Sequence, residues 1–236
     1  MDKKVDQKLV SIMKAYETLV KGIDTRAQNT ADRAYGGIVR AGKGKLVESM
    51  GKELIKIAWE DLGEDKERLS FINKTIKIPL KRDYVNRIKD PEVKEYIEKN
   101  IEKMFYRIKP DIRVHIDGKF KISIECKTYT ENAMLKRILV DCTLLKHIYP
   151  KLSFVLLQLE SQLGGDYSLS ITGKYGSPPT HTLLSYFDID LNIITLLKGE
   201  RKIDQPIHKK GYYKPLELER LKKAVEIFKK LLQKSK

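Results

Sequence analysis

Residues 109–127 read KPDIRVHIDGKFKISIECK, and this stretch decides the fold of the chain. Apolar residues alternate with polar ones over Ile112–Ile116 and again over Phe120–Ile124. A period of two is typical of a half-buried strand, and the dipeptide Asp117-Gly118 favours a tight turn between two strands. The stretch therefore predicts an antiparallel hairpin with one apolar face.

Helical periodicity surrounds this hairpin on both sides. Apolar residues recur every three or four positions in four segments, which predicts helices at 3–22, 45–62, 131–148 and 215–233. The run LSFVLLQLE at 152–160 is dense enough for a strand covered on both faces, and a further strand is expected at 191–197. This order predicts an α/β fold with a central mixed sheet, flanking helices and extra helices at both ends of the chain.

The segment between residues 69 and 109 lacks a sustained period. Pro79 and Pro91 interrupt it, and Pro91 suits the first turn of a short helix that is predicted to end near Met104. We expect the rest of the segment to form loops or lids.

The charge of the chain indicates the kind of partner. The 236 residues include 47 Lys and Arg against 32 Asp and Glu, a formal net charge of +15. Such a surplus favours a partner that supplies negative charge, and nucleic acid is the leading candidate.

The cysteines and the N-terminus suggest where the protein works. Cys126 and Cys142 form neither a disulfide framework nor a zinc motif, which fits a reducing cytoplasm. The N-terminus lacks the uninterrupted apolar run of a signal peptide or membrane span, so we expect no membrane association.

Three polar side chains near the open end of the predicted hairpin are the candidates for catalysis. Glu125 and Lys127 lie two residues apart, so strand alternation places both on one face, and the turn brings Asp111 towards the same end. Cleavage of a phosphodiester near neutral pH requires carboxylates that hold a metal ion. The competing interpretation is a cross-strand ion pair on a solvated face.

Pro110-Asp111, followed by Glu125-Cys126-Lys127, resembles the motif of the PD-(D/E)xK nuclease superfamily, to which most type II restriction endonucleases belong. The resemblance covers about residues 43–160, the expected catalytic core of a single domain that spans 1–236. It implies that Asp111 and Glu125 bind Mg²⁺, and that Lys127 orients or activates the attacking water. In this superfamily the helix before the hairpin often adds a metal-binding Glu, which implies Glu48, with Glu53 as the rival.

Two kinds of segment outside the motif are predicted to contact DNA. Glycines at 36–44 would let main-chain N–H groups approach phosphates, beside basic side chains, and residues 161–182 and 198–214 form polar or basic loops suited to recognition. The predicted DNA-binding residues are Arg33, Arg40, Lys43, Lys45, Gln162, Lys174, Tyr175, Ser177, His181, Lys209 and Lys210.

The resemblance thus implies a type II restriction endonuclease that cuts double-stranded DNA at a short specific sequence. Two symmetric cuts imply a homodimer, and such a system includes a cognate DNA methyltransferase. A structure-selective or repair nuclease on the same core is an alternative. A DNA-binding module whose Asp, Glu and Lys are coincidental is another.

Overall fold

The structure is a computed structural model that describes residues 3–27, 32–167, 175–205, 207 and 212–235. For residues 23–27 and 32–41 it describes the backbone alone.

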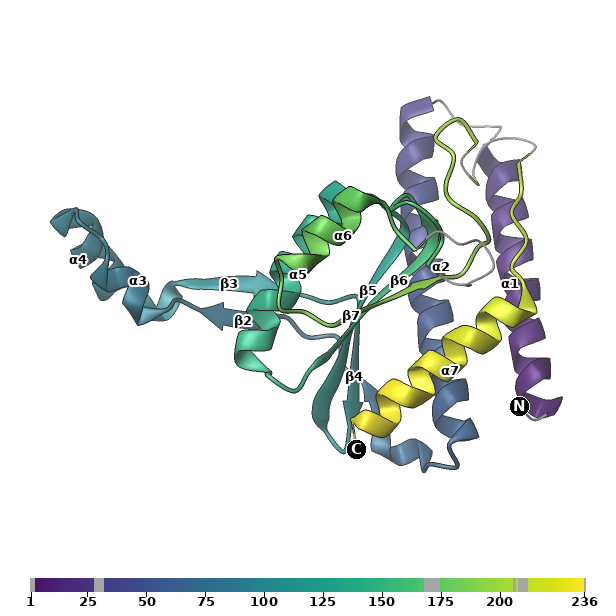
Figure 1. Cartoon of the computed structure of the whole chain (residues 1–236), viewed down its shortest axis with the longest axis horizontal. Helices are drawn as coiled ribbons and strands as arrows, with labels where there is room; N and C mark the ends of the chain where they lie inside the picture. Colours follow the sequence, from purple (N-terminus) through teal and green to yellow (C-terminus); the bar gives the residue numbers. More distant parts are fainter. Residues whose placement is uncertain (1–2, 28–31, 168–174, 206, 208–211, 236) are drawn as a thin grey trace.

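A five-stranded mixed sheet forms the centre of the molecule (Figure 1). Its order is β1-β4-β5-β6-β7, with antiparallel pairs from β1 to β5 and parallel pairs from β5 to β7. The strands span Leu69–Phe71 (β1), Ile112–Ile116 (β4), Lys119–Thr130 (β5), Ser153–Ser161 (β6) and Leu191–Thr195 (β7). The predicted fold class, a mixed sheet flanked by helices, is confirmed.

The predicted hairpin is β4 and β5. Ile112 pairs with Ile124 and Ile116 with Lys119, which leaves Asp117 and Gly118 as a two-residue turn. Both turn residues have positive φ, +50° and +73°, as the tightest hairpin turns require.

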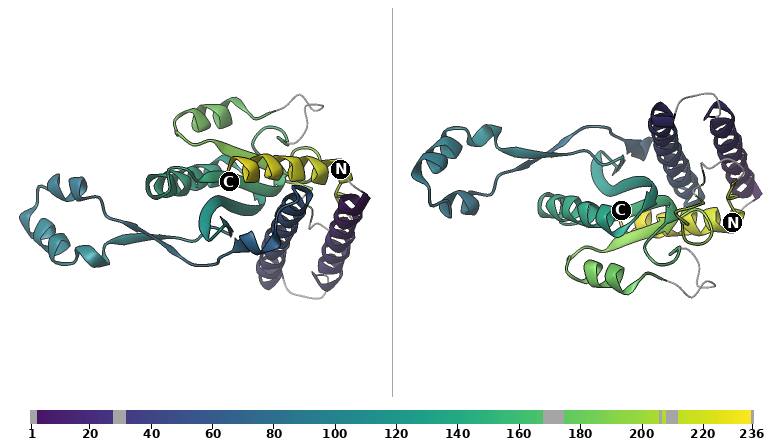
Figure 2. Two further views of the ribbon diagram at one scale, coloured as in Figure 1. Left: turned by 90° about the horizontal axis from the view of Figure 1, so that it is seen from below. Right: turned by 90° about the horizontal axis from the view of Figure 1, so that it is seen from above.

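Helices cover both faces of the sheet (Figure 2). Helices α1 (Lys3–Ala27), α2 (Asp32–Asp61) and α7 (Leu218–Lys234) share one apolar cluster with the sheet, and α5 (Asn132–Ile148) and α6 (Pro178–Ser185) share the other. Alternate residues of β6 enter the two clusters, Val155 and Leu157 one, Phe154 and Leu156 the other. The prediction that this strand is covered on both faces is confirmed.

Gly51 lets α2 lie unusually close to the sheet. A Cβ atom at this position would lie 2.7 Å from Cδ2 of Leu157 and 2.8 Å from Cδ1 of Ile112. Helix α2 therefore contacts the sheet beside the start of β4. Glu48 lies one turn before Gly51 on this helix.

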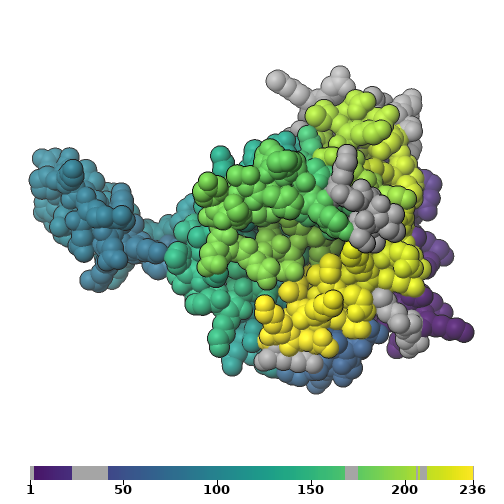
Figure 3. Space-filling view, viewed as in Figure 1, coloured from purple at the N-terminus to yellow at the C-terminus, as the bar shows by residue number. Residues whose placement is uncertain are grey.

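An arm extends away from the body between β1 and β4 (Figures 1 and 3). Strands β2 (Ile76–Pro79) and β3 (Phe105–Ile108) pair antiparallel, and α3 (Arg82–Asn86) and α4 (Pro91–Lys99) form its tip. The expectation of loops or lids here is wrong for the two strands. Each has four residues, too few to show a period, and the paired residues lie between 26 (Pro79 and Phe105) and 32 (Ile76 and Ile108) positions apart in the sequence.

Two other segments differ from the prediction. The stretch from Asp32 to Gly44, predicted as a glycine-rich wrap, is the first half of α2. The predicted loop 161–182 ends in α6, whose N-cap Ser177 precedes two prolines in the first turn.

Two short 3₁₀ helices, Lys66–Arg68 and Ile101–Lys103, complete the described elements. None of the helices in the described part is long and apolar enough to cross a membrane.

Candidate active site

The structure brings Asp111, Glu125 and Lys127 together. Nζ of Lys127 lies 2.9 Å from Oε2 of Glu125 and 3.1 Å from Oδ2 of Asp111. The pairing of Ile112 with Ile124 causes this, because it sets the preceding Asp111 opposite the following Glu125.

The main chain fixes the orientation of Asp111. The N–H group of Cys126 donates a hydrogen bond of 2.7 Å to the same Oδ2 that faces Lys127. A backbone donor is rigid, so this oxygen of the carboxylate is held in place, and the other oxygen accepts no hydrogen bond from the described residues.

Two carboxylates, Asp111 and Glu125, face one ammonium group at this site. Burial raises the pKa of Glu125, and Asp111 and Asp141 raise it further, against the opposing effect of Lys127. Burial acts to lower the pKa of Lys127, but Glu125 and Asp111 outweigh it, and the pKa is raised. The pKa values of Glu125 and Lys127 are thus both raised, so both groups favour their protonated forms, as expected where several carboxylates face one cation.

The three side chains open into a cleft of about 490 Å³. The arm provides one wall through Arg107 and Lys109, and α5 provides another through Arg137 and Asp141. Burial raises the pKa of Asp141, while Arg137 and Lys127 act in the opposite direction. Cationic walls around a carboxylate floor suit a phosphodiester that lies across the cleft.

The donor chemistry of this cleft fits Mg²⁺. Among the described residues, no group of three or more His, Cys, Asp or Glu side chains is arranged to hold a metal. Mg²⁺ differs from zinc in this respect, because it is usually held by one or two carboxylates and completes its shell with water and substrate phosphate. Asp111 and Glu125 supply these two carboxylates.

Glu48 and Glu53 lie in different surroundings on α2. The charge of Glu48 reaches the buried thiol of Cys126, whose pKa is raised well above its usual value by burial first and then by nearby carboxylates, Glu48 among them. Glu48 is half-buried and pairs with Lys52 at 2.6 Å. The Glu53 side chain is 50% exposed and pairs with Lys56. Of the two, Glu48 is the one whose charge acts on Cys126, between Glu125 and Lys127.

The glycine-rich segment does not act as predicted. Inside α2 its main-chain N–H groups are used by the helix, so they do not approach phosphates. Lys43 is only 3% exposed and is not available at the surface, whereas Lys45 is exposed. Arg33 and Arg40 belong to α2, but their side chains lie outside the described part.

In the predicted recognition loop 161–182, some described side chains form hydrogen bonds within the protein and others are exposed. Oε1 of Gln162 accepts a hydrogen bond of 2.6 Å from Arg201, and Ser177 caps α6. Tyr175 and His181 are exposed. Lys174 lies outside the described residues.

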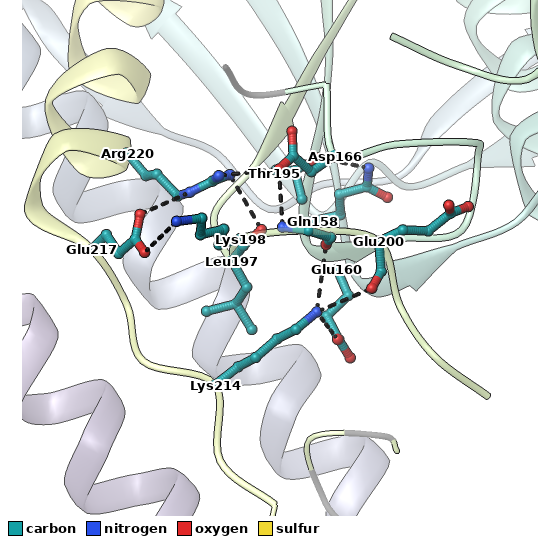
Figure 4. A network of polar contacts seen from close by, with 11 residues as sticks. Gln158, Glu160, Asp166, Thr195, Leu197, Lys198, Glu200, Lys214, Glu217 and Arg220 are labelled. Atoms are coloured by element: carbon teal, nitrogen blue, oxygen red, sulfur yellow. Dashed lines mark hydrogen bonds and ion pairs between the residues drawn. The ribbon is translucent and has the colours of Figure 1, made fainter. Parts of the chain in front are cut away.

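The second predicted loop, 198–214, is partly structural. Nζ of Lys214 lies 2.8 Å from Oε1 of the buried Glu160 (Figure 4), and Tyr212 and Tyr213 pack against the apolar cluster of α1, α2 and α7. These contacts hold the three side chains against the body of the protein. Lys209 and Lys210 lie outside the described residues.

A buried ion pair ties the root of the first loop to α7. Nη2 of Arg220 lies 3.0 Å from Oδ2 of Asp166, and neither side chain is exposed (Figure 4). The same oxygen accepts the N–H of Gly199 at 2.9 Å, and Nη1 of Arg220 donates to the carbonyl of Leu197. Both loops therefore start from one rigid polar junction.

Sequence reasoning missed three cations of the cleft, Arg107, Lys109 and Arg137. Lys109 stands two residues before Asp111, the one signal that the sequence offered. Arg107 and Arg137 reach the cleft only through the pairing of β3 with β2 and the packing of α5.

The comparisons with known proteins define the class. No family model matches the chain. It is 49% identical over 225 residues to the type II restriction enzyme DdeI of Desulfomicrobium norvegicum, an alignment that covers 93% of this chain and 94% of that enzyme. The chain therefore belongs to the family of type II restriction enzymes, and within that class it is similar to DdeI along almost its whole length. The class predicted from the sequence is confirmed.

A solved structure is also similar, at a low level. A chain of the native BbvCI A2B2 tetramer, determined at low resolution, is 13% identical, with a TM-score of 0.37 over 96% of this chain and 88% of that chain. A score this low carries no weight, and the fold assignment rests on the sheet topology described above.

Proposed function

We propose that the chain is a Mg²⁺-dependent endonuclease of the PD-(D/E)xK superfamily that cuts both strands of duplex DNA at a short specific sequence. The observation that carries this proposal is the convergence of Asp111, Glu125 and Lys127 at the floor of a cleft with cationic walls. Membership of the restriction enzyme family supports the same conclusion.

Asp111 and Glu125, with Glu48 as a further carboxylate, would hold the metal. When bound, Mg²⁺ neutralises charge on the phosphate and lowers the pKa of an attacking water. The N–H of Cys126 keeps Asp111 oriented towards the cleft. The ammonium group of Lys127, beside both carboxylates, positions the water and offsets the charge of the transition state.

A homodimer is part of this proposal, because one active site per strand makes two symmetric cuts most simply. We also propose a cognate DNA methyltransferase that protects the host's own sites. The chain would act as one domain around a catalytic core at 43–160, since both apolar clusters pack on the same sheet. The loops at 161–182 and 198–214, with exposed Tyr175 and His181, would read the sequence.

A plasmid digest with and without Mg²⁺ tests the proposal, with Asp111→Asn as the matched variant. We expect discrete fragments from the unmodified protein only when Mg²⁺ is present, and none from the variant. Nicking that depends on a junction or lesion would indicate a repair nuclease. Retarded but intact DNA in every lane would indicate a binding module. Activity that survives Asp111→Asn would refute the assigned site.

A further inference from the structure

The two strands of the arm carry an unusual concentration of positive charge. Residues 72–82 and 103–109 contain seven Lys and Arg and no Asp or Glu. The tip between them, 83–102, contains six Asp and Glu against four Lys and Arg. The charge therefore changes sign along the arm, from basic near the body to acidic at the tip.

Two of these cations lie directly opposite each other. Lys77 on β2 pairs in register with Arg107 on β3. Both stand over the ring of Phe105, with Nζ of Lys77 at 4.4 Å and Cζ of Arg107 at 5.1 Å from its centroid. Like charges at directly opposed positions destabilise a strand pair, and the contacts with the aromatic ring oppose that effect.

Neither cation is neutralised within the described part of the protein. Both side chains are exposed, and neither forms an ion pair with a described carboxylate. The opposite face of the ribbon is apolar, with Ile76, Ile78 and Ile108 buried in the same cluster as α5. The ribbon is thus held with its cationic face directed to solvent.

This cationic face continues into the active site. Arg107 and Lys109 occupy alternate positions of the chain that leads to Asp111, so they lie on one side of it, and both line the cleft with the three candidate catalytic residues. Lys77 lies beside Arg107 on the neighbouring strand and widens this cationic face across the ribbon. In Figure 3 the arm projects well beyond the rest of the surface.

We infer that this face of the arm, Lys77 with Arg107 and Lys109, is a track for the phosphate backbone of DNA that runs out of the cleft. The inference rests on the proposed function, since it takes the cleft as the place where DNA is cut. Contacts of point charges with phosphates position a duplex without reading its sequence. The acidic tip would mark the outer end of the contact, because it repels the backbone.

Salt dependence of binding tests the track. The matched pair is Lys77→Ala with Arg107→Ala against the control Lys89→Ala with Lys94→Ala, which removes the same charge at the tip. Affinity for a long duplex is measured by fluorescence anisotropy, without Mg²⁺, at several salt concentrations and on a cognate and a scrambled duplex. The slope of log K against log[salt] is negative, and each lost phosphate contact lowers its magnitude by about 0.9.

We expect the double variant of the ribbon to lower the magnitude of that slope by roughly 2 on both duplexes, and the control to leave it unchanged. Equal slopes for the two double variants would overturn the track. Analytical ultracentrifugation without DNA gives the oligomeric state of each variant. If the ribbon variant loses its oligomers while the slope stays unchanged, the track is also overturned, and the face would bind a second copy of the chain. The plasmid digest of the unmodified protein separates the two ideas: cleavage with equal slopes refutes the track alone, and a reduced slope without cleavage refutes the nuclease alone.

Discussion

Nζ of Lys127 lies 2.9 Å from Oε2 of Glu125, two residues earlier on the same strand. The contact links the group that orients the water to a group that holds the metal in the proposed mechanism. Glu125 and Lys127 can make this contact because they lie on either side of Cys126, and only alternate positions of a strand share a face.

Lys127→Ala is expected to reduce cleavage by at least about 100-fold while binding of DNA persists, since the ammonium group acts in the transition state. Lys121→Ala, on the same strand but outside the cleft, is the matched control and should cleave normally. Single-turnover cleavage of a labelled duplex measures the rate, and a mobility shift without Mg²⁺ measures binding. Normal cleavage by Lys127→Ala would remove this residue from the mechanism.

Glu48→Ala and Glu53→Ala distinguish the two carboxylates of α2. We expect Glu48→Ala to lower cleavage by roughly 10- to 100-fold and to raise the Mg²⁺ concentration required for half-maximal rate, as removal of a group near a metal does. Glu53→Ala should behave as the unmodified protein, because its exposed side chain pairs only with Lys56. The reverse order of effects in a Mg²⁺ titration would exchange the two roles.

The raised pKa of Glu125 predicts the acid limb of the pH profile. The carboxylate form holds the metal, so activity should fall as pH is lowered, and at a higher pH than an ordinary exposed Glu would produce, because burial favours the protonated form. Proton and metal compete for the same oxygens, so more Mg²⁺ should move the limb to lower pH. Single-turnover rates between about pH 5 and 8 at two Mg²⁺ concentrations test this. Superimposable acid limbs would contradict it.

Arg220→Ala should strongly destabilise the protein. It leaves the carboxylate of Asp166 buried with no guanidinium beside it, a change that costs about 3–5 kcal/mol of unfolding free energy. Lys230→Ala, at an exposed position of the same helix, should change stability by less than about 0.5 kcal/mol. Urea denaturation followed by circular dichroism measures both, and similar midpoints for the two variants would show that the pair contributes little.

Much of the fold followed from local patterns in the sequence. The hairpin was predictable because alternation and Asp117-Gly118 act between residues a few positions apart. The helices α5 and α7 were predictable because a single apolar stripe specifies each. The glycines of α2 misled the prediction, since isolated glycines raise the free energy of a helix by about 1 kcal/mol each, and packing against other elements compensates.

The arm and the walls of the cleft were not predictable in this way. Ile76 pairs with Ile108, more than thirty residues away. Strands of four residues have too weak a local preference to predict such a pair. Lys43 and Lys214 look like surface cations in the sequence, yet packing buries the first and an ion pair with Glu160 holds the second.

The sequence by itself determined the hairpin, its turn and the side on which Glu125 and Lys127 stand, because strand geometry fixes these over a few residues. Only the tertiary structure decided that Arg107, Lys109 and Arg137 line the cleft with them, and that a basic ribbon leads away from the cleft. Those relations depend on how distant elements pack, and packing is a property of the whole chain.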